Sequence, residues 1–247
     1  MDELVKWRLL ELEANDAFTN MAIDEALTMT VGSGRSPPTI RFYQWKPAGI
    51  SLGYYQDASD VLLEADCVRR ITGGAAVFHD SADLTYSVVI PEAMSSREIS
   101  ETYKGICSWM LSALSLLNIQ ASLEGNDIRV SGRKISGNAQ ARVHNAVLQH
   151  GTLIYSFDVE KTARLLKVER EKLMNEVTSI REHQQISFSE LYERVKESFV
   201  EGKDWEVDDL SDEEQILIKE LLKSKYLRKE WNLESPGKNR GPCYVKA

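Results

Sequence analysis

The sequence predicts an α+β fold in which a mixed β-sheet is flanked by helices. Short β-rich runs occur on both sides of one long helical stripe, and the last third of the chain has mostly helical periodicity. Strands that come both before and after one central helix differ from the regular strand–helix alternation of a parallel α/β sheet. The pattern therefore favours the α+β class.

The first predicted helix covers residues 15–31, because apolar side chains recur there at helical intervals after a polar start. The β-rich runs that follow are separated by Pro, Gly and Asp and predict strands: TIRFYQW (39–45), GISLGYY (49–55), AAVFH (75–79) and LTYSVVI (84–90). Polar and apolar residues alternate in TIRFYQW, which predicts that one face of this strand is wetter than the other.

The central helix is predicted over residues 95–118, where an apolar stripe recurs at helical spacing and encloses Cys107. The strand-like runs after it are DIRV (127–130), KISGNAQARV (134–143) and NAVLQHGTLIYSF (145–157).

Helical periodicity dominates from Val159 onward. Ser187 is a predicted N-cap, and Ser211 followed by Glu214 matches a capping box. Acidic residues cluster where this last helix begins, and the helix dipole accounts for them without a ligand: Asp208, Asp209, Asp212, Glu213 and Glu214.

The 247 residues, 43% of them hydrophobic, suit one large domain with its own core, and the residues from 236 to 247 have the loop composition of a flexible tail. The net charge of −8 argues against a nucleic-acid partner, which would demand a basic patch. The N-terminus lacks the apolar core of a signal peptide, and no apolar run is long enough to span a membrane. We therefore expect a cytoplasmic protein that binds neither nucleic acid nor membrane.

The three cysteines, Cys67, Cys107 and Cys243, are widely separated and form no C-x-x-C pair. They predict neither a disulfide framework nor a zinc site, which fits a reducing compartment. Cys67 lies beside two arginines whose charge would lower the pKa of its thiol, whereas Cys107 is expected to fill space inside a helix.

The segment VRRITGGAAVFHD (68–80) combines two arginines with a Gly-Gly pair and small residues. The glycines alone are compatible with an ordinary hairpin turn. With the arginines, the segment could bind a phosphate or carboxylate, because guanidinium donors would meet an anion that approaches the backbone closely. It is neither a P-loop nor a Rossmann turn, since no Gly-Lys-Ser/Thr follows and a strand rather than a helix comes next.

A second constellation lies in GNDIRVSGRKISGNAQ, where Asn126 and Asp127 precede Lys134 across a short predicted hairpin. A carboxylate there could hold Mg²⁺ while the ammonium neutralises a phosphate, although GRK alone is also typical of a solvated turn. His79 and His150 lie in or beside strand-like runs, and a structural imidazole is the simpler interpretation of each.

RRITGGAAVFHD and GRKISGNAQ, followed by LQHGTLIYSFD, together resemble the signature of the lipoate–protein ligase family, within the group that includes biotin–protein ligases and octanoyltransferases. The resemblance implies a catalytic domain over residues 1–235 with a fold like that of class II aminoacyl-tRNA synthetases and biotin–protein ligases. It also implies a reaction in which lipoate and ATP form lipoyl-adenylate and the acyl group passes to a lysine of a lipoyl-domain protein.

Carried onto this chain, the resemblance implies that Lys134 is catalytic and bridges the ATP phosphate and the lipoate carboxylate. Asp127 would serve Mg²⁺. The acceptors would be of the 2-oxoacid dehydrogenase acyltransferase subunit or glycine cleavage H protein type. An apolar slot for the acyl chain would come from residues 40–90. The implied set for ATP and lipoyl-adenylate is Arg69, Arg70, Gly73, Gly74, Ala75, Ala76, Val77, His79, Asn126 and Lys134.

The sequence departs from the family pattern in three places. Ala75 replaces the third glycine of Gly-Gly-Gly-Ala-Val. The chain also stops soon after KEWNLE, where many ligases continue into an accessory domain, so a separate small subunit could supply that domain. LTYSVV and SGNAQARVHNAVLQHG look closer to octanoyltransferases, which carry the acyl group on a cysteine upstream of GRK. SLEGNDIRV contains no cysteine. We therefore rank the ligase first, octanoyl transfer from acyl carrier protein second, and a non-catalytic acyl-binding module or subunit third.

Overall fold

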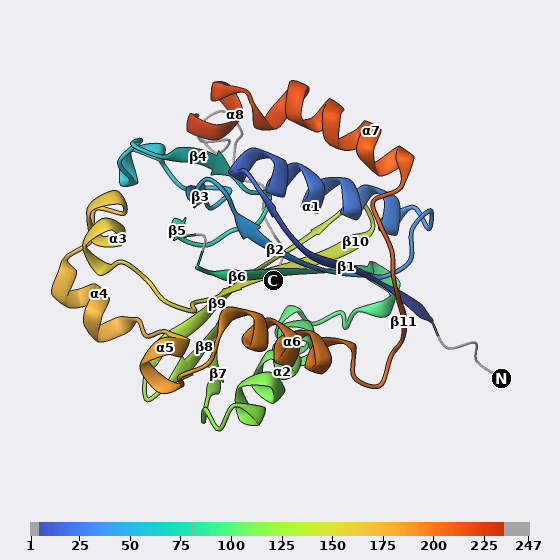
Figure 1. Cartoon of the computed structure of the whole chain (residues 1–247). Helices are drawn as coiled ribbons and strands as arrows, with labels where there is room; N and C mark the ends of the chain where they lie inside the picture. The colour runs from blue at the N-terminus through green and yellow to red at the C-terminus, as the bar shows by residue number, and fades with distance from the viewer. Residues whose placement is uncertain (1–4, 81, 235–247) are drawn as a thin grey trace.

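A computed structural model describes residues 5–80 and 82–234, which contain an eight-stranded mixed sheet and a three-stranded sheet (Figure 1). The strand order in the large sheet is β11-β1-β2-β6-β10-β9-β8-β7, and in the small sheet β4-β3-β5. The strands are β1 (Lys6–Asn15), β2 (Thr39–Trp45), β3 (Gly49–Leu52), β4 (Asp66–Arg69), β5 (Val77–His79), β6 (Leu84–Pro91), β7 (Ser122–Glu124), β8 (Asp127–Val130), β9 (Arg133–Val143), β10 (Ala146–Leu153) and β11 (Asp204–Val207).

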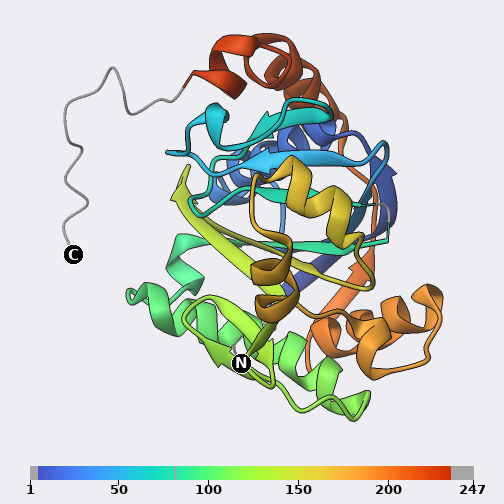
Figure 2. The ribbon, with the colours of Figure 1, turned by 90° about the vertical axis from the view of Figure 1, so that its left-hand side faces the viewer.

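Helices cover both faces of the large sheet. α1 lies on one face, beneath α7 and α8, while α2 and α6 lie on the other (Figure 1). Figure 2 shows the same layers from the side, from the red C-terminal helices down to green α2. The helices are α1 (Ala17–Gly32), α2 (Ile99–Leu116), α3 (Val159–Leu165), α4 (Arg170–Glu176), α5 (Ile180–His183), α6 (Phe188–Val200), α7 (Asp212–Leu221) and α8 (Lys229–Leu233), with a π-helical turn at Leu222–Tyr226.

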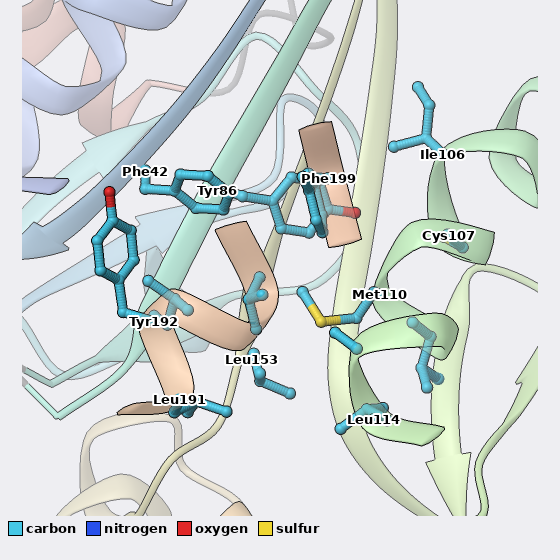
Figure 3. Close-up of a cluster of buried hydrophobic side chains, with 14 of the residues drawn as sticks. Phe42, Tyr86, Ile106, Cys107, Met110, Leu114, Leu153, Leu191, Tyr192 and Phe199 are labelled. Carbon is cyan, nitrogen blue, oxygen red and sulfur yellow. The ribbon is translucent and has the colours of Figure 1, made fainter. Parts of the chain in front are cut away.

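The larger core lies between the sheet and the pair α2 and α6 (Figure 3). The ring of Phe199 on α6 packs edge-on against those of Phe42 and Tyr86, with centroid separations of 5.3 and 4.8 Å. Cys107 is buried in this core, as its place on the predicted helical stripe indicated. Burial of these rings holds α6, a late element of the chain, against early strands.

β2 occupies the predicted residues, but the prediction of a wetter face is wrong. Its side chains do alternate: Ile40 and Phe42 enter the core beneath α2 and α6, and Tyr43 and Trp45 enter the core beneath α1. Arg41 shares the α1 face and is fully buried, because carboxylates of α1 and β1 neutralise it there. Alternation marks a half-exposed strand only when one face of the sheet is open to water.

The two outer strands β11 and β1 were not predicted from the sequence. β1 pairs in parallel with β2 and with β11, and both segments carry charged residues that mask their strand character. Arg8 of β1 is buried, and its guanidinium forms a two-pronged ion pair with Glu214 of α7 at 2.8 and 2.6 Å. This long-range contact neutralises the charge that β1 buries when it pairs with β2 and β11.

Both predicted helix starts are confirmed. The Ser187 side chain accepts a hydrogen bond from the backbone N–H of Glu190 at the start of α6. Ser211 and Glu214 form the expected capping box at the start of α7. Glu214 has a further role that the helix dipole does not explain, since it is fully buried against Arg8.

No helix in the described ranges combines the length and the apolar character that crossing a membrane requires. The tail predicted at 236–247 lies outside the described residues, as does Cys243.

The Arg8–Glu214 pair predicts a specific acid sensitivity. Burial raises the pKa of the Glu214 carboxyl, but hydrogen bonds from Arg8 and the charge of Arg8 lower the pKa by more, and the result is a pKa of about 2. Because this pKa lies below the ordinary value of 4.5, the stability from the pair is fully present above that pH and is lost as the pH falls toward 2. Glu214→Gln should lower the free energy of unfolding at neutral pH by about 3–5 kcal/mol, because it leaves a buried guanidinium unpaired.

Chemical denaturation between pH 7 and pH 2 measures both effects. The matched control is Glu213→Gln, which removes an exposed ion pair with Arg35 and should cost less than about 1 kcal/mol. An unchanged acid slope in the Glu214 variant would contradict the assignment.

Candidate functional site

Two adjoining cavities lie where the glycine-rich segment meets strands β9 and β10. The first, of about 110 Å³, is lined by Met21, Tyr43 and Trp45 on one side and by His79, His150 and the glycine-rich segment on others. The second, of about 190 Å³, has a mostly apolar lining that includes Phe157, Leu166 and Val177. Five residues line both cavities: Ala76, Val77, Lys134, Gly137 and Thr152.

The glycine-rich segment, residues 70–76, is a crossover loop rather than a hairpin turn. It joins β4 to β5, which do not pair with each other: β4 runs parallel to β3 on one side, and β5 runs antiparallel to β3 on the other. Gly74 has a φ of 98°, in the region that favours glycine. A Cβ at Gly53 would lie 1.8 Å from the Gly74 carbonyl oxygen, so the loop needs a glycine beneath it as well.

Arg70 holds this loop in place. Its Nη2 donates to the carbonyl oxygens of Gly73 and Ala75 at 2.7 and 2.9 Å, and its Nη1 donates to the carbonyl oxygen of Ser51 at 3.0 Å. Its Nε donates to the Thr72 hydroxyl at 3.1 Å. Burial lowers the pKa of Arg70 to about 10, so the group stays charged at neutral pH.

A buried polar chain supports Arg70 from behind. His150 Nδ1 lies 2.9 Å from Asp24 Oδ2, and its Nε2 lies 2.7 Å from the Thr72 hydroxyl oxygen. The Thr72 hydroxyl oxygen also accepts from Arg70 Nε, so it connects the imidazole to the guanidinium. The hydrogen-bond network thus fixes the orientation of the His150 ring, which agrees with the structural interpretation from the sequence.

Asp24 keeps its charge although it is fully buried on α1. Burial raises the pKa of its carboxyl, but the hydrogen bond with His150 and the charge of Arg41 together hold the pKa below its ordinary value. Arg41 Nη1 donates to Asp24 Oδ1 at 3.0 Å, and the Tyr43 hydroxyl donates to Oδ2 at 3.1 Å. A carboxylate on the buried face of an apolar helix is the sequence signal that could have identified Asp24 as a site residue.

His79 lies flat on the Trp45 indole, with ring centroids 3.8 Å apart and planes 2° from parallel. Its Nε2 is 2.9 Å from the Ser51 hydroxyl, which also accepts from Arg70. Burial, followed by the charge of Arg70, lowers the pKa of His79 well below its ordinary value. The first cavity is therefore walled in part by the neutral imidazole of His79 and the indole of Trp45, a lining suited to an apolar ligand.

Lys134 stands between the two cavities. Its ammonium donates to Asp127 Oδ1 at 2.8 Å across the β8–β9 pairing, and its side chain is one-third exposed. A Cβ at Gly137 would lie 2.5–2.6 Å from the Lys134 Cε and Nζ atoms, so the glycine provides the space through which the lysine reaches its position. The hairpin thus brings the predicted Asp127 and Lys134 into direct contact.

Asn126 lines the first cavity and is locked to Asn138 of β9. Asn126 Nδ2 donates to the Asn138 carbonyl at 2.6 Å, and Asn138 Nδ2 donates to the Asn126 carbonyl at 2.9 Å. The Tyr86 hydroxyl donates to Asn138 Oδ1 at 2.7 Å. A Cβ at Gly151 would collide with Asn138 Oδ1, which accounts for the glycine of the LQHG segment.

Asp83 is a candidate residue that the sequence did not reveal. Its side chain lines the second cavity, is almost fully buried, and its Oδ1 has no hydrogen-bond partner among the described residues. Burial raises the pKa of this carboxyl well above its ordinary value. The unpartnered oxygen is itself fully buried, so the cavity lining by Asp83 comes from other atoms of the residue.

Most of the predicted ligand-binding residues come together at the cavities, and two do not line them. Arg70, Gly74, Ala75, Ala76, Val77, His79, Asn126 and Lys134 line the first cavity, whereas Arg69 and Gly73 line neither. The Arg69 guanidinium is buried and donates to backbone carbonyls only: those of Gly53, Tyr54, Gln56, Trp231 and Asn232. Arg69 is therefore placed to support the loop and not to touch a ligand in the cavities.

Ala75 occupies its position without backbone strain. The non-glycine residues with positive φ in the described part of the chain are Asn118, Ser131, His144, Asn145 and Lys167, and Ala75 is not among them. Ala75 lines the first cavity, and its backbone conformation does not require a glycine.

The described residues provide few ligands for a metal ion. They contain no cluster of three His, Cys, Asp or Glu side chains with metal-binding geometry. Asp127 is the carboxylate available beside Lys134, and its second oxygen accepts from Arg129 at 3.2 Å. One carboxylate suffices for Mg²⁺ only when phosphate oxygens and waters complete the shell, so the donor set fits a metal delivered with a nucleotide and not a resident one.

Neither described cysteine lines a cavity. Cys67 is buried in the core of the small sheet, and burial raises the pKa of its thiol to about 11, so the expectation of a lowered pKa beside the arginines is wrong. Desolvation outweighs the charge of Arg69. Burial also raises the pKa of Cys107 to about 11.

Comparison with known proteins agrees with this geometry. Residues 16–200 match the family described as "Lipoyl protein ligase A/B catalytic domain". The octanoyltransferase LipM of Brevibacillus brevis is 32% identical over 277 residues, 92% of this chain and 99% of that protein. A lipoate-protein ligase A solved with bound ATP superimposes with a TM-score of 0.84 at 27% identity, over 92% of this chain and 98% of that one. A bi-partite lipoate protein ligase of Thermoplasma acidophilum, from a study that included its E2 lipoyl domain, reaches 0.85 at 26% identity, over 98% and 100%. The expected fold, a mixed sheet flanked by helices as in these ligases, is confirmed.

Gly137→Ala should displace Lys134 without unfolding the chain. The new methyl group would meet the far end of a flexible side chain, which can move away, so the free energy of unfolding should change by no more than about 1 kcal/mol. A crystal structure of the variant should show the Lys134–Asp127 contact broken. The matched control, Gly105→Ala, adds a methyl group where nothing lies within 4 Å on α2 and should leave that contact intact. An unmoved Lys134 in the Gly137 variant would refute this account.

Proposed function

Because the chain belongs to the family of lipoyl protein ligase A/B catalytic domains, we propose that it is an ATP-dependent lipoate–protein ligase. It converts lipoate and ATP to lipoyl-adenylate and passes the lipoyl group to a lysine of a lipoyl-domain protein. The proposal rests on the lining of the two cavities. Lys134 lines both of them, and no cysteine lies among their described lining residues. A reaction without an enzyme thiol needs an acyl donor that is activated in another way, and an acyl-adenylate is such a donor.

The two cavities divide the substrate between them. The first, walled by Trp45, His79 and Met21, takes the acyl chain and dithiolane ring, because its polar groups are already paired with one another. The second takes the base, between the apolar side chains of Phe157, Leu166 and Val177. The expected acyl slot from residues 40–90 thus covers only part of the lining, since α1, β9 and β10 contribute the rest.

Lys134 acts where the two cavities meet. The carboxylate of the acid attacks the α-phosphate of ATP and pyrophosphate leaves, so negative charge develops between the acyl and nucleotide halves. The Lys134 ammonium, oriented by Asp127, stabilises this charge and then the AMP leaving group when the acceptor amine attacks the acyl carbonyl. Mg²⁺ arriving with ATP would neutralise the outer phosphates, with Asp127 as its nearest carboxylate.

The loop from 70 to 76 supplies the remaining wall. Ala76 and Val77 line both cavities, so the backbone there runs alongside the junction of the acyl and nucleotide halves. The Arg70 guanidinium holds this backbone in place before a ligand binds, so ligand binding does not have to supply the free energy of ordering the loop. We propose a supporting role for Arg69 in place of direct nucleotide contact.

A second candidate is octanoyl transfer from acyl carrier protein to a lipoyl domain. The name of the Brevibacillus brevis relative, octanoyltransferase LipM, favours it. The absence of a thiol from the described lining opposes a version that carries the acyl group on Cys67 or Cys107. A non-catalytic module is disfavoured, because the chain retains both the enzyme family's fold and the Lys134–Asp127 pair.

The donor assay separates the two enzyme proposals. The purified chain is given an apo lipoyl domain as acceptor, in one arm with ATP, Mg²⁺ and lipoate or octanoate, and in another with octanoyl-acyl carrier protein and no ATP. We expect pyrophosphate release and an increase in acceptor mass in the first arm only. A third arm with prepared lipoyl-adenylate tests the transfer step alone, so that a need for a separate subunit in activation becomes visible.

Acylation in the second arm would overturn the ligase proposal in favour of octanoyl transfer. The triple variant Cys67→Ser, Cys107→Ser, Cys243→Ser serves as the mechanistic control. It should keep its activity in the first arm, since the proposed chemistry uses no thiol.

Lys134→Met should lower kcat of the first arm by about 100- to 1000-fold, the loss typical of removing one charge-stabilising donor. The fold should persist because the ammonium is partly exposed. Lys172→Met, which changes an exposed lysine on α4, is the matched control and should retain full activity. A Lys134 variant within threefold of the unmodified chain would exclude the proposed role.

A further inference from the structure

The C-terminal helix α8 is bonded to the strand that leads into the glycine-rich loop. The indole N–H of Trp231 donates to the Arg69 carbonyl at 2.9 Å, and Asn232 Oδ1 accepts from the Arg69 backbone N–H at 3.0 Å. Both backbone groups of Arg69 are thus satisfied by one short helix from the far end of the described chain.

The side chain of Arg69 also binds α8. Its Nε donates to the Trp231 carbonyl at 3.0 Å, and its Nη2 donates to the Asn232 carbonyl at 3.2 Å. Arg69 is fully buried, and no carboxylate within the described residues forms an ion pair with it. A buried charge that is solvated only by carbonyl oxygens needs all of them, so its position depends on α8 staying docked.

Arg69 connects α8 to the loop by two routes. Along the chain, the next residue is Arg70, which fixes the carbonyls of Gly73 and Ala75. Through space, Arg69 Nη1 donates to the carbonyls of the turn at 53–56, and that turn packs beneath the Gly74 carbonyl. The Tyr54 backbone N–H also donates to the Thr72 carbonyl at 2.8 Å. Displacement of α8 would therefore loosen both supports of the loop.

The helix is itself anchored to the body of the protein. The Trp231 ring lies edge-on to those of Tyr54 and Tyr226, and the ammonium of Lys225 lies 3.9 Å above it. Lys225 in turn binds both carboxylate oxygens of Glu25 on α1, at 2.8 and 2.7 Å. Only a firmly held helix can transmit a constraint to the loop.

We propose that Trp231 and Asn232 are positioning residues, which latch α8 onto Arg69 and so keep the glycine-rich loop in its binding conformation. The latch touches neither cavity and acts through Arg69, Arg70 and the 53–56 turn. The expected effect of the latch on activity rests on the proposed function, in which the loop forms the wall against which the activated acyl group lies.

Trp231→Phe tests the latch, because it removes the indole N–H donor and keeps an aromatic ring between Tyr54 and Tyr226. Hydrogen exchange of backbone amides in residues 70–77 should accelerate by about five- to tenfold, the change expected from one lost hydrogen bond, while β9 and β10 keep their protection. Trp205→Phe, which changes a partly exposed tryptophan on β11, is the matched control and should change neither region.

Activity provides the second readout. With the acyl donor that the donor assay identifies, Trp231→Phe should raise the KM for that donor by about five- to tenfold and leave the KM for the lipoyl-domain acceptor unchanged. Asn232→Ala should act in the same direction, and its thermal midpoint is measured alongside. A merely structural role would lower the folded fraction and leave both KM values of the folded enzyme unchanged.

Unchanged exchange rates in residues 70–77 of both variants would overturn the latch. The exchange measurement needs no substrate, so it decides this inference even if neither donor supports activity, a result that would count against the proposed function alone.

Discussion

The site depends on one buried cation, Arg70, that has no carboxylate partner among the described residues. The Arg70 guanidinium is bound by backbone carbonyls of Ser51, Gly73 and Ala75 and by the Thr72 hydroxyl, so the loop wraps around the charge instead of pairing it. Removing the guanidinium would leave several buried carbonyls without donors, which is far more costly than losing one surface contact. The shape of the first cavity follows from this arrangement, because the loop forms one of its walls.

The rest of the fold supplies supports for that loop. From α1, Asp24 orients His150, which is hydrogen-bonded to the Thr72 hydroxyl that also binds Arg70. From the C-terminal end, α8 binds the neighbouring Arg69. The two cores, above and below the large sheet, fix the distances among these elements, so early and late parts of the chain meet at one site. A rigid scaffold of this kind suits chemistry that relies on prearranged charge.

Lys134 is the charged side chain that the two cavities share, and neither described thiol lines them. Under the proposed function, an ammonium between two adjoining cavities binds at the junction of an acyl half and a nucleotide half. Sequence relatives named octanoyltransferase LipM keep the second candidate open. Burial of Cys67 and Cys107 raises the pKa of both thiols, which makes them poor nucleophiles at neutral pH.

The sequence by itself determined the α+β class, most strands of the central sheet, both helix caps at Ser187 and Ser211, and the paired motifs that contain Gly74 and Lys134. These features depend on local periodicity and local hydrogen bonds, which a sequence records directly. Only the tertiary structure decided that β1 joins the sheet through Arg8, that Arg69 supports the loop, and that Asp24 and Asp83 belong to the site. Each of these depends on partners far apart in the chain and on burial, which sets both the pKa of an acid and the number of donors left for a ligand.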